Sequence, residues 1–121
     1  EVKVMFKELR WQNAPTFEQY WSDVEEARRT GFAVDIGRYN RNFTTVAAPI
    51  LTSSGEATMA ISAITFSGDL DRPRMLRLAA DLKRVTGEAS NALGYSGSPT
   101  GAKAAGRGNT AFRKQRTTTA P

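Results

Sequence analysis

The stretch from residue 31 to residue 68 reads GFAVDIGRYNRNFTTVAAPILTSSGEATMAISAITFSG, and it contains nearly all of the strand-forming sequence of this chain. Alternating and continuous apolar runs within it predict three strands, over residues 32–36, 45–51 and 58–66. A loop of hairpin size around Gly55 separates the last two, so we expect them to pair antiparallel. Pro49 has no backbone N–H to donate to a ladder, which predicts an edge or a bulge at this point of its strand.

A helix is predicted immediately upstream, over residues 16–30. Thr16 suits an N-cap, and Gln19 is placed to complete a capping box with it. Apolar side chains then recur at helical spacing, and Gly31 is a typical C-terminal stop.

A second helix is predicted downstream, from Asp71 to Gly94. Asp71 suits an N-cap, and Pro73 falls in the first turn, where its missing amide does no harm. An apolar stripe follows, comprising Met75, Leu78, Ala79, Leu82, Val85, Thr86, Ala89, Ala92 and Leu93.

The two ends of the chain differ in composition from its centre. Residues 1–15 form a lead-in segment whose alternation suits an edge strand, although a short helix fits equally well. Residues 95–121 are rich in Gly, Thr, Ala and basic side chains and have almost nothing to bury, so we predict a disordered, basic tail. The tail holds five basic residues and no acidic one, so the net charge of +5 belongs to it.

Cysteine and histidine are both absent from the 121 residues. Their absence removes disulfides, thiolate metal sites, cysteine nucleophiles, the usual general base and the commonest metal ligand. Asp69 and Asp71 have no third carboxylate near them in sequence, and Asp71 is better used as a helix cap. We therefore expect no enzyme, no cofactor and no metal site. No apolar run approaches the roughly 18 residues of a membrane span, so no membrane partner is expected either.

Three short motifs resemble the C-terminal effector-binding domain of the IclR family of bacterial transcriptional regulators. They are Gly31-Phe32-Ala33-Val34-Asp35, Ala47-Ala48-Pro49-Ile50 followed by Gly55, and Ala60-Ile61-Ser62. The resemblance covers roughly residues 16–94. It implies an α+β fold, a GAF-like or profilin-like antiparallel sheet with flanking helices, of which this chain would carry the C-terminal part.

The resemblance also implies a function. The domain would bind a small organic effector, expected to be acidic, and would signal to an N-terminal winged helix-turn-helix outside this chain that binds DNA. Such a regulator is expected to be cytoplasmic and to form a homodimer or homotetramer. An alternative of another class is a small nucleic-acid-binding protein that uses the basic tail and the loop from Arg38 to Arg41.

The resemblance groups five residues into an effector pocket: Asp35, Phe43, Thr45, Ser62 and Ile64. From the residues alone, Asp35 fits equally a solvent-facing acid on a half-buried strand, and Phe43 fits plain core. Ser62 lies among apolar neighbours, so its hydroxyl must find a partner, in the backbone or in a ligand. Ile64 stands where the family often has a small polar residue, which implies a less polar wall.

Two arginines next to this group are candidate anion contacts. Arg38 and Arg41 flank Tyr39 in a loop between the first two predicted strands. Guanidinium groups bind carboxylates well, so these cations are the candidates for an effector's acid group. A plain solvated loop explains the same residues.

Overall fold

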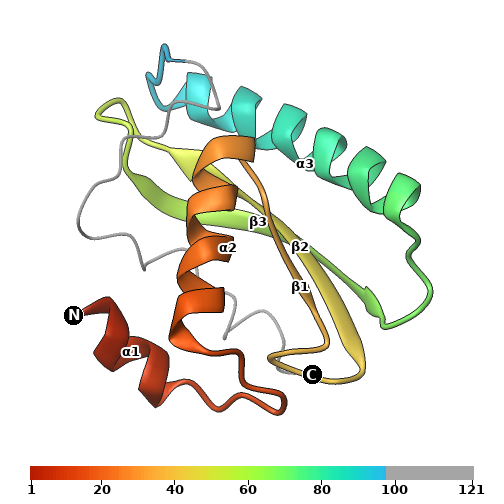
Figure 1. Cartoon of the computed structure of the whole chain (residues 1–121). Helices are drawn as coiled ribbons and strands as arrows, with labels where there is room; N and C mark the ends of the chain where they lie inside the picture. The colour runs from red at the N-terminus through yellow and green to blue at the C-terminus, as the bar shows by residue number, and fades with distance from the viewer. Residues whose placement is uncertain (98–121) are drawn as a thin grey trace.

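The computed structural model describes residues 1–97, and in them three helices accompany one antiparallel sheet (Figure 1). The elements in chain order are α1 (Val2–Glu8), α2 (Phe17–Thr30), β1 (Ala33–Ile36), β2 (Phe43–Leu51), β3 (Ala57–Phe66) and α3 (Arg72–Ala92). The predicted α+β class is confirmed. The tail predicted from residue 95 lies, from residue 98 onward, outside the described residues.

The sheet has the order β1-β2-β3, and both pairings are antiparallel. The predicted hairpin of β2 and β3 is thus confirmed. Pro49 belongs to the middle strand, but β1 pairs with β2 only as far as Ala47. Because Pro49 lies beyond that point, its missing N–H falls where β2 is locally at an edge, as predicted.

Helix α3 covers one face of the sheet. Val46 and Ala48 of β2 pack against Ala79 and Leu82 of the helix, and these four residues form the buried core cluster. Small alanines on both sides let the helix lie close to the strand. The helix begins at Asp71, whose side chain accepts from the Arg74 amide at 2.9 Å, as expected of an N-cap. 

Part of the predicted apolar stripe of α3 does not reach the core. Val85 and Leu93 are 40% and 46% exposed. The helix packs mainly on β2, so its buried positions are those on the side facing that strand. Thr86 and Ser90 take buried positions instead, and the Ser90 hydroxyl accepts from the Leu51 amide at 2.9 Å while donating to the Thr86 carbonyl at 2.6 Å.

Helix α2 passes in front of the strands in Figure 1, on the side away from α3. The predicted capping box is present: the Thr16 hydroxyl accepts from the Gln19 amide, and the Gln19 side chain accepts from the Thr16 amide. Gly31 ends the helix in the left-handed conformation at φ 84°, which a residue with a Cβ rarely adopts. 

The lead-in segment, left open between strand and helix, folds as the short helix α1. Its Phe6 ring packs on Trp11, Phe17 and Tyr20, with centroids 5.1 to 5.6 Å apart. Aromatic packing therefore holds the lead-in segment against the start of α2. Within residues 1–97, no helix has the length and the apolar character needed to cross a membrane.

Candidate functional site

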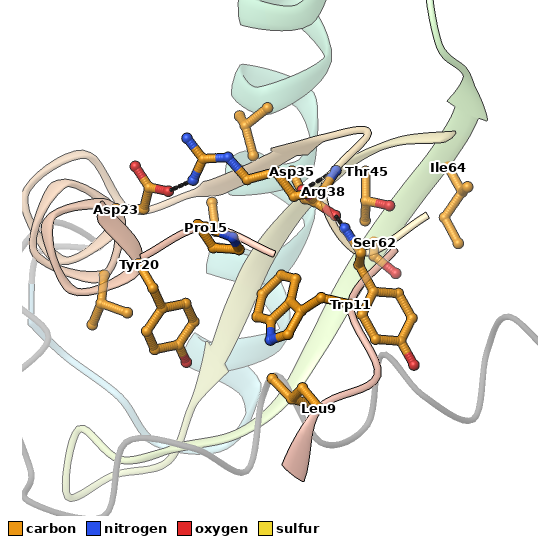
Figure 2. Close-up of a pocket in the computed structure, with 14 residues that line it drawn as sticks. Leu9, Trp11, Pro15, Tyr20, Asp23, Asp35, Arg38, Thr45, Ser62 and Ile64 are labelled. Carbon is orange, nitrogen blue, oxygen red and sulfur yellow. Dashed lines mark hydrogen bonds and ion pairs between the residues drawn. The ribbon is translucent and has the colours of Figure 1, made fainter. Parts of the chain in front are cut away.

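A cavity of about 100 Å³ lies on the sheet face opposite α3, between the strands and the lead-in segment (Figure 2). Strands, α2, the loop after β1 and the lead-in segment all contribute to its wall. The residues that line it are Leu9, Trp11, Pro15, Tyr20, Asp23, Val24, Ala33, Val34, Asp35, Arg38, Tyr39, Thr45, Ser62 and Ile64. We refer to it as the lead-in cavity.

Side chains from two adjacent cross-strand rows of the sheet form the floor of the cavity. Asp35 pairs with Thr45, and Thr45 pairs with Ile64, so these three side chains share one face. Ala33 and Ser62 line the cavity from the adjacent row, each paired with Ala47. The alternation of side chains along the strands thus sends this set away from α3.

Asp35 also shapes the loop that follows β1. Its two carboxylate oxygens accept hydrogen bonds from the backbone amides of Arg38 and Tyr39, at 3.2 and 3.0 Å. Gly37 makes the turn at φ 66°, and a Cβ there would lie 3.3 Å from the Arg41 carbonyl oxygen. The carboxylate is therefore half-buried and held in place, with its charge directed at the loop and the cavity wall.

The roof is the lead-in segment, which four hydrogen bonds fasten to the same loop. Gln12 and Asn13 donate backbone N–H groups to the carbonyls of Tyr39 and Arg38, at 3.2 and 2.8 Å. In return, Arg41 donates its amide to the Gln12 side chain at 2.9 Å and its guanidinium to the Gln12 carbonyl at 3.3 Å. The roof is thus positioned by backbone pairing, although it belongs to no strand.

Trp11 is the central residue of the roof. In Figure 2 it lies between Tyr20 and Ser62, below Pro15 and Asp35. Its ring meets those of Tyr20 and Tyr39 edge to face, with centroids 6.0 Å apart in both cases. Its indole N–H donates to the Phe6 carbonyl at 3.2 Å, so the polar edge of the ring is occupied by the backbone.

Charges gather at one side of the cavity. The Arg38 guanidinium forms an ion pair with Asp23, which joins the loop after β1 to α2. The side chains of both residues are substantially exposed, so this pair adds little to stability on its own.

Burial raises the pKa of the Tyr20 hydroxyl from its ordinary value, because the charged form loses hydration.

Five of the seven residues predicted for the site line this cavity: Asp35, Thr45, Ser62, Ile64 and Arg38. Phe43 does not line it; its ring stacks on the cross-strand partner Phe66 at a centroid distance of 5.6 Å. Arg41 does not line it either, since its guanidinium is turned to Gln12.

The roof and the α2 wall were missed by the sequence reasoning. Trp11, Pro15, Tyr20, Asp23 and Tyr39 all line the cavity. A signal was present, because Trp11 is a large aromatic residue in a short segment without a strand or helix pattern of its own. The pattern does not say which surface such a residue covers.

A second cavity of about 110 Å³ lies at the other end of the sheet, between the end of β2 and the last turns of α3. Its wall includes Pro49, Leu51, Lys83, Ser90 and Asn91. None of the predicted site residues lies there. Among residues 1–97, no group of three or more carboxylates could hold a metal ion.

Solved structures of bacterial regulators share this fold. The Agobacterium tumefaciens repressor BlcR matches with a TM-score of 0.65 at 21% identity, over 74% of this chain and 36% of that chain. An IclR transcriptional regulator from Alicyclobacillus acidocaldarius matches with a TM-score of 0.65 at 19% identity, over 76% of this chain and 38% of that chain. The C-terminal domain of the E. coli transcriptional regulator KdgR matches with a TM-score of 0.57 at 17% identity, over 78% of this chain and 60% of that chain.

Neither a protein-family model nor the sequence of a curated protein matches the chain. At these identities the structural matches establish the fold. The resemblance to the IclR effector-binding domain is confirmed at that level, and these structural neighbours are transcriptional regulators, not enzymes. The chain spans between about a third and three fifths of the length of these neighbours, so it presents part of the domain.

Proposed function

We propose that this chain is the ligand-sensing part of a DNA-binding transcriptional regulator, and that a small organic effector binds in the lead-in cavity. The observation that carries the proposal is the convergence of polar side chains from three strands, Asp35, Thr45 and Ser62, on one cavity with an aromatic roof. Pockets for small molecules have this composition, mostly apolar with a few placed polar groups. The family resemblance implies the rest: a winged helix-turn-helix outside this chain, a homodimer or homotetramer, and the cytoplasm as location.

The construction of the roof supports a role in signalling. Residues 12 and 13 are held to the loop after β1 by four hydrogen bonds, and the cavity lies between the lead-in segment and the sheet. A ligand that contacts both Trp11 and the strands would favour one position of the lead-in segment over others. Such a difference in affinity between two arrangements is the requirement for transmitting a binding event.

A thermal-shift screen of small organic molecules tests the proposal directly. A ligand at about 100 times its dissociation constant adds about 2.7 kcal/mol to the stability of the folded state. Thr45→Val removes a hydroxyl from the cavity floor and should weaken the shift. Thr65→Val makes the same change on the opposite face of the sheet and should leave the shift unchanged.

Two outcomes would contradict the assignment. One is a broad panel that produces no shift with folded protein. The other is a ligand whose affinity responds equally to Thr45→Val and Thr65→Val, because that ligand would bind elsewhere.

The alternative, nucleic-acid binding through the basic tail and the loop from Arg38 to Arg41, has less support. In the structure Arg38 is paired with Asp23 and Arg41 with Gln12, so both guanidinium groups already have partners. This alternative predicts that removing residues 95–121 abolishes binding to nucleic acid, and that the affinity falls steeply with salt. The sensing proposal predicts that the same truncation leaves effector binding intact.

A further inference from the structure

We infer that the lead-in cavity is built for an organic cation, an ammonium group carrying a small apolar body, and not for an acid. The inference rests on the proposed function, because it concerns the effector of the same site. Two independent features carry it: the charges in the wall and the arrangement of the aromatic rings.

Of the residues that the structure describes, two carboxylates and one cation are the charged members of the wall. Asp23 and Asp35 line the cavity together with Arg38, and Arg38 is already paired with Asp23. Arg41, the other cation expected near the effector, is turned away to Gln12. Within residues 1–97, the charge in the wall that has no ion-pair partner is therefore the negative one of Asp35.

An acid and a cation meet this wall very differently. A carboxylate ligand would have to share Arg38 with Asp23 and would lie beside Asp35, whose position is fixed by two backbone amides. Like charges in a partly buried site raise the free energy of the bound state. An ammonium group leaves the Asp23–Arg38 pair intact and gains attraction to Asp35.

The aromatic rings add a second attraction for a cation. Trp11 lies between Tyr20 and Tyr39, and the interplanar angles are 73° and 78°. Three electron-rich rings, those of Trp11, Tyr20 and Tyr39, thus line one cavity, and such rings attract a cation, as in sites for quaternary ammonium ligands. Because the Trp11 N–H is bonded to the Phe6 carbonyl, the positive edge of the indole is not offered to the ligand.

The remaining wall explains the apolar body. Leu9, Pro15, Val24 and Ile64 contribute carbon surface, while Thr45 and Ser62 add hydroxyls on the sheet side. A volume of about 100 Å³ suits a small molecule. A compound such as choline combines a quaternary ammonium with a hydroxyl at this scale.

The test compares three probes of one shape that differ in charge: choline, the neutral isostere 3,3-dimethylbutan-1-ol, and 3,3-dimethylbutanoate. Each is titrated into the full 121-residue chain at low ionic strength, and binding is followed by ¹H–¹⁵N NMR through the Trp11 indole signal, identified with a Trp21→Phe variant. Choline should bind about tenfold tighter than the neutral isostere, and the carboxylate should bind weakest.

One charge variant sharpens the test. Asp23→Asn releases Arg38, so the preference for choline over the carboxylate should fall by about threefold. Asp81→Asn removes an acid from the exposed Asp81–Arg84 pair on α3, outside the cavity, and should leave the preference unchanged.

A second pair of variants tests the rings. Trp11→Leu removes the central ring without changing the charge, whereas Trp21→Leu removes a tryptophan that does not line the cavity. Only the first should reduce the advantage of choline over its neutral isostere, and because Trp11→Leu removes the indole signal, both variants are followed through the backbone amide signals of Thr45 and Ser62. If Trp11→Leu does not fold, the Asp23→Asn comparison still decides.

The possible results separate this inference from the proposed function. If the neutral isostere or the carboxylate binds as tightly as choline or more tightly, the inference of a cationic effector is wrong, but the cavity remains the proposed effector site. The inference of a cationic effector is also wrong if choline does not bind while another compound of the broad panel shifts the melting temperature and the Trp11 signal. The proposed function survives that result. If no compound binds at all, both proposals fail.

Discussion

The two faces of the sheet are built from the same three strands, yet over the middle of β2 one face is closely packed and the other is hollow. On the α3 face, Val46 and Ala48 meet Ala79 and Leu82, and all four are buried. On the other face, Thr45, Ser62 and Ile64 lie under the lead-in segment with a cavity between them. The contrast lies in what covers each face.

Over the middle of β2, the small residues of α3 let the helix approach the strand closely, and the second cavity lies only beyond this contact, at the end of the strand. On the other face, the lead-in segment presents Trp11 and α2 presents Tyr20, and the two rings pack against one another and against Phe6. Large rings that support one another do not collapse onto short side chains such as those of Thr45 and Ser62. The closed face therefore holds the fold together, and the hollow face is available for a ligand.

The largest expected difference between the faces concerns apolar truncation. Leu82→Ala on the α3 face should lower the free energy of unfolding by about 2–5 kcal/mol, because it leaves a void in the core. Ile64→Ala, at a residue 37% exposed beside the cavity, should cost about 1 kcal/mol or less. Denaturant unfolding measures both. Equal costs would mean that the two faces are packed alike.

A matched pair of serines gives the next effect. Ser90→Ala removes a buried hydroxyl that accepts from the Leu51 amide, so an amide loses its partner and about 1–3 kcal/mol of stability is lost. Ser62→Ala removes a hydroxyl at the cavity and should change stability by less than about 0.5 kcal/mol. A larger loss for Ser62→Ala would indicate a structural role for that hydroxyl.

Variants at the two helix N-caps distinguish an effect on stability from an effect on the lead-in cavity. Thr16→Ala removes the capping box of α2 and Asp71→Ala removes the N-cap of α3, and each should cost about 1 kcal/mol. Only Thr16→Ala should shift the NMR signals of Trp11 and Tyr20, because α2 and the segment before it form the cavity wall. Similar shifts in both variants would show that the faces are coupled.

The smallest expected effect is a loss of folding stability at alkaline pH, caused by Tyr20 in the wall of the lead-in cavity. Burial raises the pKa of Tyr20 in the folded state above its ordinary value of 10.0. The folded state therefore holds this proton more tightly than the unfolded state, so the contribution to stability is complete below pH 10 and declines as the pH rises further. Unfolding measured against pH should show this decline, and Tyr20→Phe should lessen it. An unchanged slope would remove Tyr20 as its source.

The family resemblance grouped much of the candidate site, and the period of two in strands explains why most of that group shares one face. Once residues 33–36 and 43–51 pair, Asp35 and Thr45 must share a face, and the hairpin adds Ile64 to the same row. Phe43 has the same parity as Thr45 but lies at the end of the sheet, where it stacks on Phe66. The parity of a residue fixes its face, whereas its distance along the strand decides whether the cavity reaches it.

The caps of α2 and α3 and the presence of three strands could be predicted from the sequence, whereas the lead-in segment was left open between strand and helix. The side chains of Thr16 and Asp71 accept from amides three residues further on, and Gly31 donates its own amide to the Ala27 carbonyl, so these local interactions are visible in a sequence. Only the tertiary structure decided what covers each face. Gln12 and Arg41 are 29 residues apart, and their hydrogen bonds, which place Trp11 over the sheet, follow no periodicity. The balance of charges in the cavity wall also depends on tertiary structure, because the ion pair of Arg38 and Asp23 joins the loop after β1 to α2.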